Sequence, residues 1–87
     1  MKQVKIKKGH AYAVQTGDFV GQMFIVCNIS KDNIGCLSVP DMKNVFVPID
    51  KWDIGRNSGI IEYVEDIKGD VLKVCKAQYE KNENSNN

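Results

Sequence analysis

Four short apolar segments between residues 22 and 64 decide the fold of this chain. They read QMFIVCNIS (22–30), IGCLSV (34–39), NVFVPI (44–49) and GIIEYV (59–64). Turn-forming residues, 31–33 and 40–42, separate the first three, and a longer stretch, 50–58, precedes the last. Short β-branched segments spaced about 8–12 residues apart are typical of a small antiparallel sheet that curls into a barrel. We therefore expect a mainly β fold.

The two ends of the chain add one strand and one helix. Residues 3–7 and 11–15 alternate apolar and polar side chains around Gly9-His10, which indicates one bent or bulged strand. From Gly69-Asp70 onward, apolar residues recur at helical spacing, so we expect a helix over 70–81. Residues 82–87 contain no apolar side chain and are expected to be disordered. With 87 residues there is room for one domain, which we assign to 1–81.

Two local interpretations determine which side chains should be buried. The segment 49–55 is short and irregular, which favours one 3₁₀-like turn with Trp52 and Ile54 pointing inward. The segment 23–29 is apolar on both faces of a strand. We expect the core face to carry Met23, Ile25, Cys27 and Ile29, because the opposite face ends in Asn28.

Charge is unevenly distributed along the chain although the net charge is only +1. Residues 1–10 carry four lysines and a charge of +4, whereas residues 11–67 carry −4 and residues 68–87 carry +1. A classical nucleic-acid-binding barrel would have a basic body. A mildly acidic body with a basic end therefore weakens, without removing, a nucleic-acid-binding interpretation.

Other patterns bear on compartment and cofactors. The longest apolar run, Met23–Cys27, is far too short to cross a bilayer, and MKQVKIKKGH lacks the features of a secretory signal. We expect a cytoplasmic protein whose three cysteines are reduced and fill apolar sites. The alternative of a disulfide between Cys27 and Cys36, on adjacent strands, is disfavoured in a reducing compartment. A zinc site of His10 with the three cysteines is disfavoured by their irregular spacing, so no metal or cofactor is expected.

No catalytic constellation is found in the sequence. Asp50 and Asp53 flank Trp52 but lack a neighbouring nucleophile or metal cluster, so turn and solvation roles are favoured over acid–base catalysis. His10 is the single histidine and has no nameable partner, which favours a surface or structural role. We do not expect an enzyme.

Five short strands with a 3₁₀-like turn before the last resemble SH3-like small barrels. The stretches TGDFVGQMFIV (16–26) and VPIDKWDIG (47–55) carry this resemblance. The chain also looks like the small accessory proteins encoded by tailed bacteriophages, which are short single domains. The resemblance implies a five-stranded antiparallel barrel with one C-terminal helix. It also implies a non-enzymatic role, binding a host or viral macromolecule in the bacterial cytoplasm.

Two binding hypotheses follow, and self-association remains a further option. In the first, a host or viral protein meets the loops 16–21, 31–33 and 50–58. The site residues are then two apolar anchors and a charged rim: Phe19, Trp52, Asp18, Asp50, Asp53 and Arg56. In the alternative, nucleic acid binds basic and aromatic residues: Lys2, Lys5, Lys7, Lys8, Arg56, Phe24 and Phe46. Stacking requires both phenylalanines on outer faces of neighbouring strands; otherwise they pack under the C-terminal helix.

Overall fold

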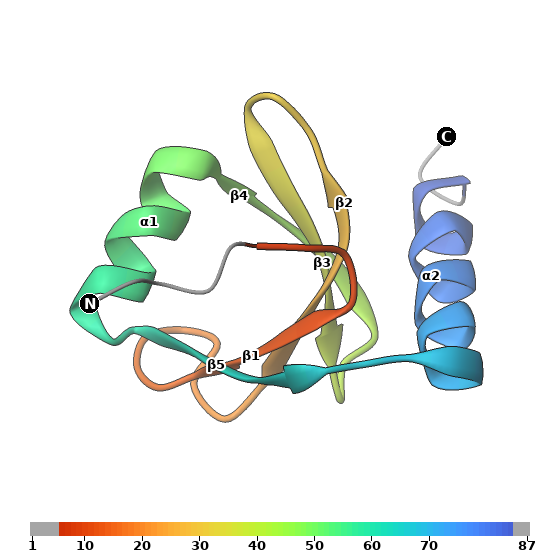
Figure 1. Cartoon of the computed structure of the whole chain (residues 1–87), viewed down its shortest axis with the longest axis horizontal. Helices are drawn as coiled ribbons and strands as arrows, with labels where there is room; N and C mark the ends of the chain where they lie inside the picture. The colour runs from red at the N-terminus through yellow and green to blue at the C-terminus, as the bar shows by residue number, and fades with distance from the viewer. Residues whose placement is uncertain (1–5, 85–87) are drawn as a thin grey trace.

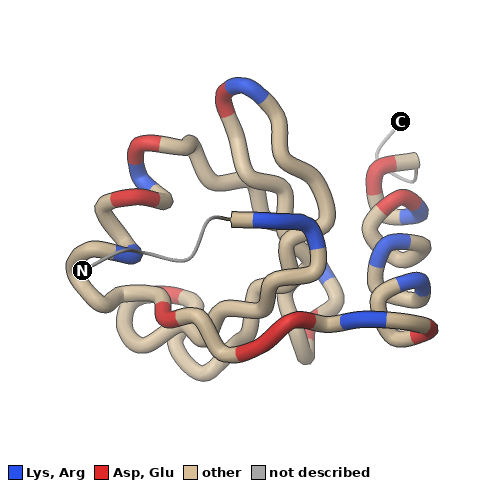
Figure 2. The backbone as a smooth tube through the Cα atoms, viewed as in Figure 1, with Lys and Arg blue, Asp and Glu red and all other residues tan. Residues whose placement is uncertain are grey.

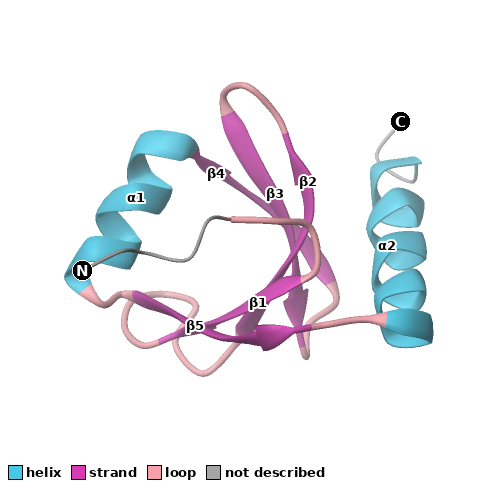
Figure 3. Cartoon of the chain, in the orientation of Figure 1, coloured by secondary structure: helices cyan, strands magenta, loops and turns pink. Residues whose placement is uncertain are grey.

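A computed structural model of the chain describes residues 6–84 (Figure 1). The elements follow in the order β1 (His10–Val14), β2 (Met23–Ile29), β3 (Asn33–Val39), β4 (Lys43–Pro48), α1 (Ile49–Ser58), β5 (Ile61–Asp66) and α2 (Gly69–Asn84). The fold is mainly β, with five antiparallel strands in one sheet and two helices, which Figure 3 distinguishes by colour. From residue 10 onward the expected strands lie within about two residues of the observed ones, because period-two alternation marks strands well.

The sheet is open, with strand order β4-β3-β2-β1-β5. Within the described residues β4 and β5 do not pair with each other, so the expected closed barrel is not observed. The reason lies in the connection between them. Pro48 ends β4 because proline cannot donate to a ladder, and the ten residues of α1 follow directly. α1 contacts both edge strands and occupies the space where closure would occur.

Each face of the sheet is covered by one helix, so the protein has two small cores. One core contains aromatic and aliphatic side chains under α1: Tyr12, Val14, Phe24, Val26, Ile34, Cys36, Trp52 and Ile61. The other lies under α2 and comprises Ala11, Ile25, Cys27, Leu37, Cys75 and Tyr79. Figure 1 shows the two helices on opposite sides of the sheet.

The single core face expected for β2 is therefore only half correct. Ile25 and Cys27 are buried as expected, but Phe24 and Val26 of the opposite face are equally buried. Ile29, assigned to the core, is 36% exposed at the end of the strand. A strand with helices on both faces buries both sets of side chains, which explains its continuous apolar run.

The segment 49–58 forms a full α-helix instead of the expected 3₁₀-like turn. Gly59 ends this helix in the left-handed region, with φ of 80°. Trp52 is buried as expected, whereas Ile54 is 62% exposed. At about 100° per residue, positions two apart in an α-helix lie on nearly opposite sides, so both cannot point inward.

The C-terminal helix is confirmed and extends beyond its expected end at residue 81 to Asn84. Residues 82–84, assigned to a disordered tail, are helical, and residues 85–87 lie outside the described part of the chain. The Nδ2 amide of Asn82 donates to the Met42 carbonyl at 2.9 Å and to Asn44 Oδ1 at 3.0 Å. Polar side-chain contacts thus hold a helical turn that has no apolar residues.

The N-terminal expectation is only partly met. β1 begins at His10, residues 6 and 7 are not strand, and residues 3–5 lie outside the described region. Gly9 has φ of 97°, and a Cβ there would lie 2.9 Å from the Ile67 carbonyl oxygen. Glycine is therefore required where the chain turns into the sheet. The irregularity in pairing falls two positions beyond Gly9-His10, between Ala11 and Tyr12 opposite β5.

Candidate functional site

An apolar pocket of about 500 Å³ lies between α1 and the loop that joins β1 to β2. Its walls come from the end of β1, the loop, β2, β4, α1 and the start of β5: Val14, Thr16, Gly17, Asp18, Phe19, Phe24, Val47, Lys51, Trp52, Ile54, Gly55, Ile60 and Ile61. Pockets of this size that are mostly apolar with a few polar groups are the usual form of binding sites. The pocket is therefore the candidate functional site.

The loop wall is shaped by glycines and by short backbone hydrogen bonds. Gly17 and Gly21 have φ of 93° and 87°, values that favour glycine. The Val20 amide donates to the Gly17 carbonyl at 3.2 Å, and the Gly21 amide donates to the Val14 carbonyl at 3.2 Å. The Phe19 ring meets Phe24 edge-on with ring centroids 5.5 Å apart. The loop therefore places Phe19 over the edge of the buried core.

The helical wall is placed by close packing of α1 against the sheet. Trp52 is 2% exposed, and its ring meets Tyr12 edge-on at a centroid distance of 4.9 Å. Gly55 is buried and faces Ile61, at a distance that leaves an ordinary contact for a Cβ, so α1 packs directly on β5. Trp52 thus forms a fixed wall of the pocket and does not project toward a partner.

Exposed apolar side chains surround the opening. Phe19, Ile54 and Ile60 line the pocket and are 42%, 62% and 40% exposed. Single exposed apolar residues are normal on protein surfaces, but several around one pocket indicate a place where something binds. The fold brings Phe19 of the β1–β2 loop next to Ile54 and Ile60, which follow it by 35 and 41 positions in the sequence.

The structure brings together three of the six residues predicted for protein binding. Asp18, Phe19 and Trp52 line the pocket, whereas Asp50, Asp53 and Arg56 lie on α1 without lining it. Sequence reasoning missed Lys51, Ile54 and Ile60 as pocket residues. The sequence predicts Ile60 only as part of a strand and predicts Ile54 in the interior. A prediction of an α-helix over 49–58, with Trp52 on its buried side, would have placed Ile54 on the exposed side.

The residues predicted for nucleic-acid binding do not form one surface. Phe24 is 5% exposed in the core under α1, while Phe46 is 52% exposed on the opposite face, its ring centroid 6.0 Å from that of Tyr79. β3 lies between β2 and β4, so the two strands are not neighbours. The expected stacking platform is therefore absent. Of the lysines, Lys7 and Lys8 are exposed, and Lys2 and Lys5 lie outside the described residues.

The alternative expectation was that both phenylalanines pack under the C-terminal helix. Only Phe46 does so. Phe46 contacts α2 through Tyr79, whereas Phe24 belongs to the core under α1. The two rings point to opposite faces because Gly35 pairs with Phe46, while Phe24 pairs with Ser38 on the same strand three residues on. Neither of the two expected arrangements is therefore complete.

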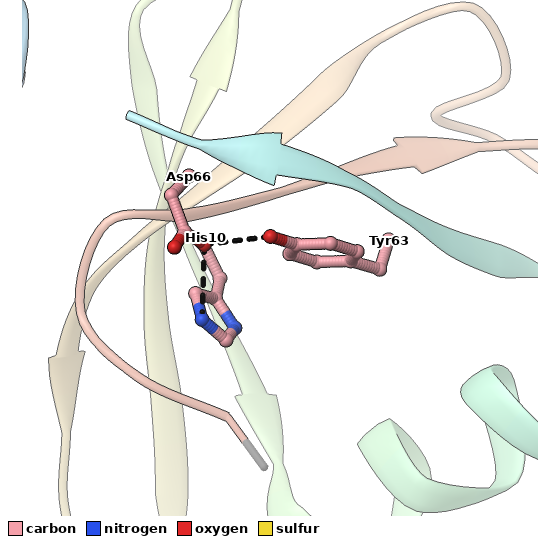
Figure 4. Close-up of polar contacts among 3 residues, drawn as sticks. All are labelled: His10, Tyr63 and Asp66. Carbon is pink, nitrogen blue, oxygen red and sulfur yellow. Dashed lines mark hydrogen bonds and ion pairs between the residues drawn. The ribbon is translucent and has the colours of Figure 1, made fainter. Parts of the chain in front are cut away.

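His10 belongs to a polar cluster that joins the two strands at one edge of the sheet (Figure 4). It is 4% exposed, and its Nε2 lies 3.1 Å from Asp66 Oδ1. The Tyr63 hydroxyl donates to the same oxygen at 2.7 Å. The hydrogen bond from Tyr63, with a smaller contribution from His10, lowers the pKa of Asp66, and the same hydrogen bond raises the pKa of Tyr63. The contacts connect β1 to β5, in agreement with a structural role for the histidine.

The three cysteines are buried and free. Cys36 belongs to the core under α1, and Cys27 to the core under α2 together with Cys75. Burial raises the pKa of the Cys27 thiol to about 11 and also raises the pKa of the other two thiols. Because the side chains of Cys27 and Cys36 lie on opposite faces of the sheet, they are not placed to form the disulfide considered from the sequence.

Within the described residues, neither a metal-binding cluster nor a membrane-spanning helix is found. Residues 6–84 contain no group of three or more histidine, cysteine, aspartate or glutamate side chains arranged to hold a metal ion. Neither described helix has the length and apolar character needed to cross a membrane.

Comparison with known proteins does not assign the chain to a family. A scan against protein-family models, a search of curated proteins and a search of solved structures each returned no match. The function must therefore be inferred from the pocket itself.

Proposed function

We propose that this chain is a non-enzymatic binding module whose apolar pocket takes an apolar side chain of a partner protein. The observation that carries the proposal is the pocket between the β1–β2 loop and α1, with exposed Phe19, Ile54 and Ile60 around its opening. In the setting implied by the phage resemblance, the partner is a host or viral protein in the bacterial cytoplasm. We also propose that the five-stranded sheet is related to the SH3-like small barrels that the sequence resembles.

The chemistry of the lining supports binding over catalysis. Its polar side chains are Thr16, Asp18 and Lys51, and all three are exposed at the opening. The His10–Asp66 pair does not line the pocket. General acid–base catalysis needs a titratable group held against the bound molecule. The deep part of this pocket instead offers Val14, Phe24 and Trp52 for apolar contact.

Burial of one apolar side chain in the pocket would supply enough binding free energy for an interaction of moderate affinity. Burying one leucine-sized side chain contributes about 1.5–3 kcal/mol, roughly a ten- to a hundredfold change in Kd. Apolar anchors placed in pockets dominate the energetics of many protein interfaces. The exposed rim around the opening can exclude water from such an anchor.

The test is affinity capture from a bacterial lysate with wild-type protein and two pocket variants, Ile54→Ser and Phe19→Ser. Both side chains are exposed, so the variants should fold normally, as thermal unfolding can verify. We expect the same captured protein to be lost in both variants. For a purified partner we expect Kd to rise by at least about tenfold for Ile54→Ser.

A matched control comes from the second helix. Val74 on α2 is 62% exposed, the same fraction as Ile54, and lies on the opposite side of the sheet. Val74→Ser should retain every partner that wild type captures. Equal recovery of all partners by wild type, both pocket variants and the control would contradict the proposed function.

A further inference from the structure

The edge strand β5 begins at the pocket and continues away from it. Ile60 and Ile61 line the pocket, and the strand then runs to Asp66. Within residues 6–84, β5 pairs with β1 on one side and with no strand on the other. In Figure 1, β5 lies along the border of the sheet. An unpaired strand edge is a template for an extended segment of another chain.

Side chains along this edge are exposed and mostly acidic. Glu62, Val64 and Glu65 are exposed, and Val64 is 48% exposed. Val64 is the extra residue at the irregularity opposite Ala11 and Tyr12, so Glu62 and Glu65 lie on the same face of the sheet. Figure 2 marks acidic residues along β5. The pocket wall itself carries one charge of each sign, Asp18 and Lys51, so the acidic character belongs to β5. Asp66 is not part of this surface because it already contacts His10 and Tyr63. Glu62 accepts a hydrogen bond from the uncharged amide of Gln15, Nε2 to Oε2 at 3.4 Å.

These charges discriminate between two kinds of occupant. If β5 of a second copy paired with this edge, the acidic residues of the two strands would lie close together. Like charges opposite each other in a sheet are destabilising, whereas opposite charges contribute about 0.2–1 kcal/mol a pair. The edge therefore suits a basic strand from another protein and disfavours self-pairing of this chain.

We infer that the partner binds as an extended basic segment, with one apolar residue in the pocket and the following residues alongside β5. Lysine or arginine side chains then lie opposite Glu62 and Glu65, and an apolar side chain contacts Val64. The backbone of the segment hydrogen-bonds to the free edge of β5. This inference rests on the proposed function and specifies the partner that the same pocket accepts.

The probes are two short fluorescent peptides with the same central leucine and flanking valines. The first carries lysine at alternate positions, and the second carries glutamine there. We expect the lysine peptide to bind wild-type protein about tenfold more tightly than the glutamine peptide, from two or more opposite-charge pairs. The double variant Glu62→Gln/Glu65→Gln should lower its affinity to that of the glutamine peptide.

A matched control removes the same charge elsewhere. Glu80→Gln/Glu83→Gln changes two exposed carboxylates of α2, which packs on β2, β3 and β4. This variant should bind the lysine peptide as wild type does. Amide hydrogen exchange measured by NMR should slow in residues 61–66 when the peptide is bound, because the free edge becomes hydrogen-bonded.

The outcomes separate this inference from the proposed function. Equal affinity for the two peptides, an equal loss in the two double variants, or no added protection in β5 would overturn the extended basic segment. No binding of the lysine peptide would overturn it as well. The pocket itself is judged by Ile54→Ser: loss of captured partners in that variant would support the pocket even if the charge preference is absent.

Discussion

The two helices cover opposite faces of one sheet, yet they cover them differently. α2 is held against its face by polar contacts, including the Asn44 Nδ2 donation to the Tyr79 carbonyl at 2.9 Å, and a smaller pocket of about 230 Å³ lined mostly by polar side chains lies beside it. α1 buries Trp52 but leaves a pocket of about 500 Å³ with Ile54 exposed beside it. The larger and more apolar pocket lies on the α1 side, where an incompletely covered apolar face is available for a partner. The comparison supports the proposal that the α1 side binds a partner while α2 mainly stabilises the fold.

The largest expected effect is that of removing the buried ring of α1. Trp52→Ala should cost about 3–5 kcal/mol, because it leaves a cavity between α1, Tyr12 and the sheet. Domains of this size have only about 5–10 kcal/mol of stability, so the variant should be largely or partly unfolded. Chemical denaturation followed by circular dichroism measures the loss. A loss below 1 kcal/mol, roughly a surface effect, would show that α1 is not part of the core.

A smaller effect is expected where Tyr79 of α2 packs on Gly35 of the sheet. A Cβ at Gly35 would overlap the Tyr79 hydroxyl, so Gly35→Ala should cost about 1–3 kcal/mol by overpacking. Tyr79→Phe removes that hydroxyl, and in its background the Gly35→Ala substitution should cost clearly less. A double-mutant cycle of unfolding free energies measures this coupling. Additive costs would indicate that the ring does not rest on Gly35.

The polar connection of β1 to β5 should make stability depend on pH. The pKa of Asp66 is lowered in the folded protein, mainly by the hydrogen bond from Tyr63. A lowered folded pKa means that this carboxylate stabilises the fold above its unfolded pKa of about 4, and that the contribution is lost as the pH falls below it. Wild type should exceed Asp66→Asn in stability at neutral pH, and the difference should shrink on acidification. Denaturation at several pH values measures it, and a constant difference would contradict the assignment.

The smallest expected change in stability sharpens the comparison of the two helices. Ile54→Ser and Val74→Ser each replace a side chain that is 62% exposed, so each should alter the unfolding free energy by less than about 1 kcal/mol. Partner binding should nevertheless be lost only for Ile54→Ser. Thermal unfolding of both variants, alongside binding, distinguishes a damaged fold from a damaged site. Equal binding by both would remove the functional difference between the helices.

Sequence reasoning located the elements of the sheet well and the first helix poorly. The apolar alternation of 34–39 and 44–49 is strong, and the corresponding strands lie within one residue of prediction. Residues 49–58 have few apolar side chains, and only Trp52 and Gly55 among them are buried. A helix that packs through two positions leaves little periodic signal, which explains why a shorter turn was expected.

Three of the six residues predicted for protein binding, Asp18, Phe19 and Trp52, meet in one pocket. The resemblance to SH3-like barrels indicated the loops at 16–21 and 50–58, with Phe19 and Trp52 as apolar anchors. Their meeting in one pocket depends on α1 crossing from β4 back to β5, which local pattern does not encode. The acidic rim at Asp50 and Asp53 was expected on a loop. On a helix those side chains lie away from the pocket lining.

The amino-acid sequence by itself determined where the strands and the long C-terminal helix lie, because period-two and helical repeats are local properties. It also marked the absence of an evident catalytic constellation. Only the tertiary structure decided that the sheet stays open, that both faces of β2 are buried, and that Phe19 and Ile54 flank one pocket. The physical reason is that alternation says which side chains share a face, while packing between distant segments decides what covers that face.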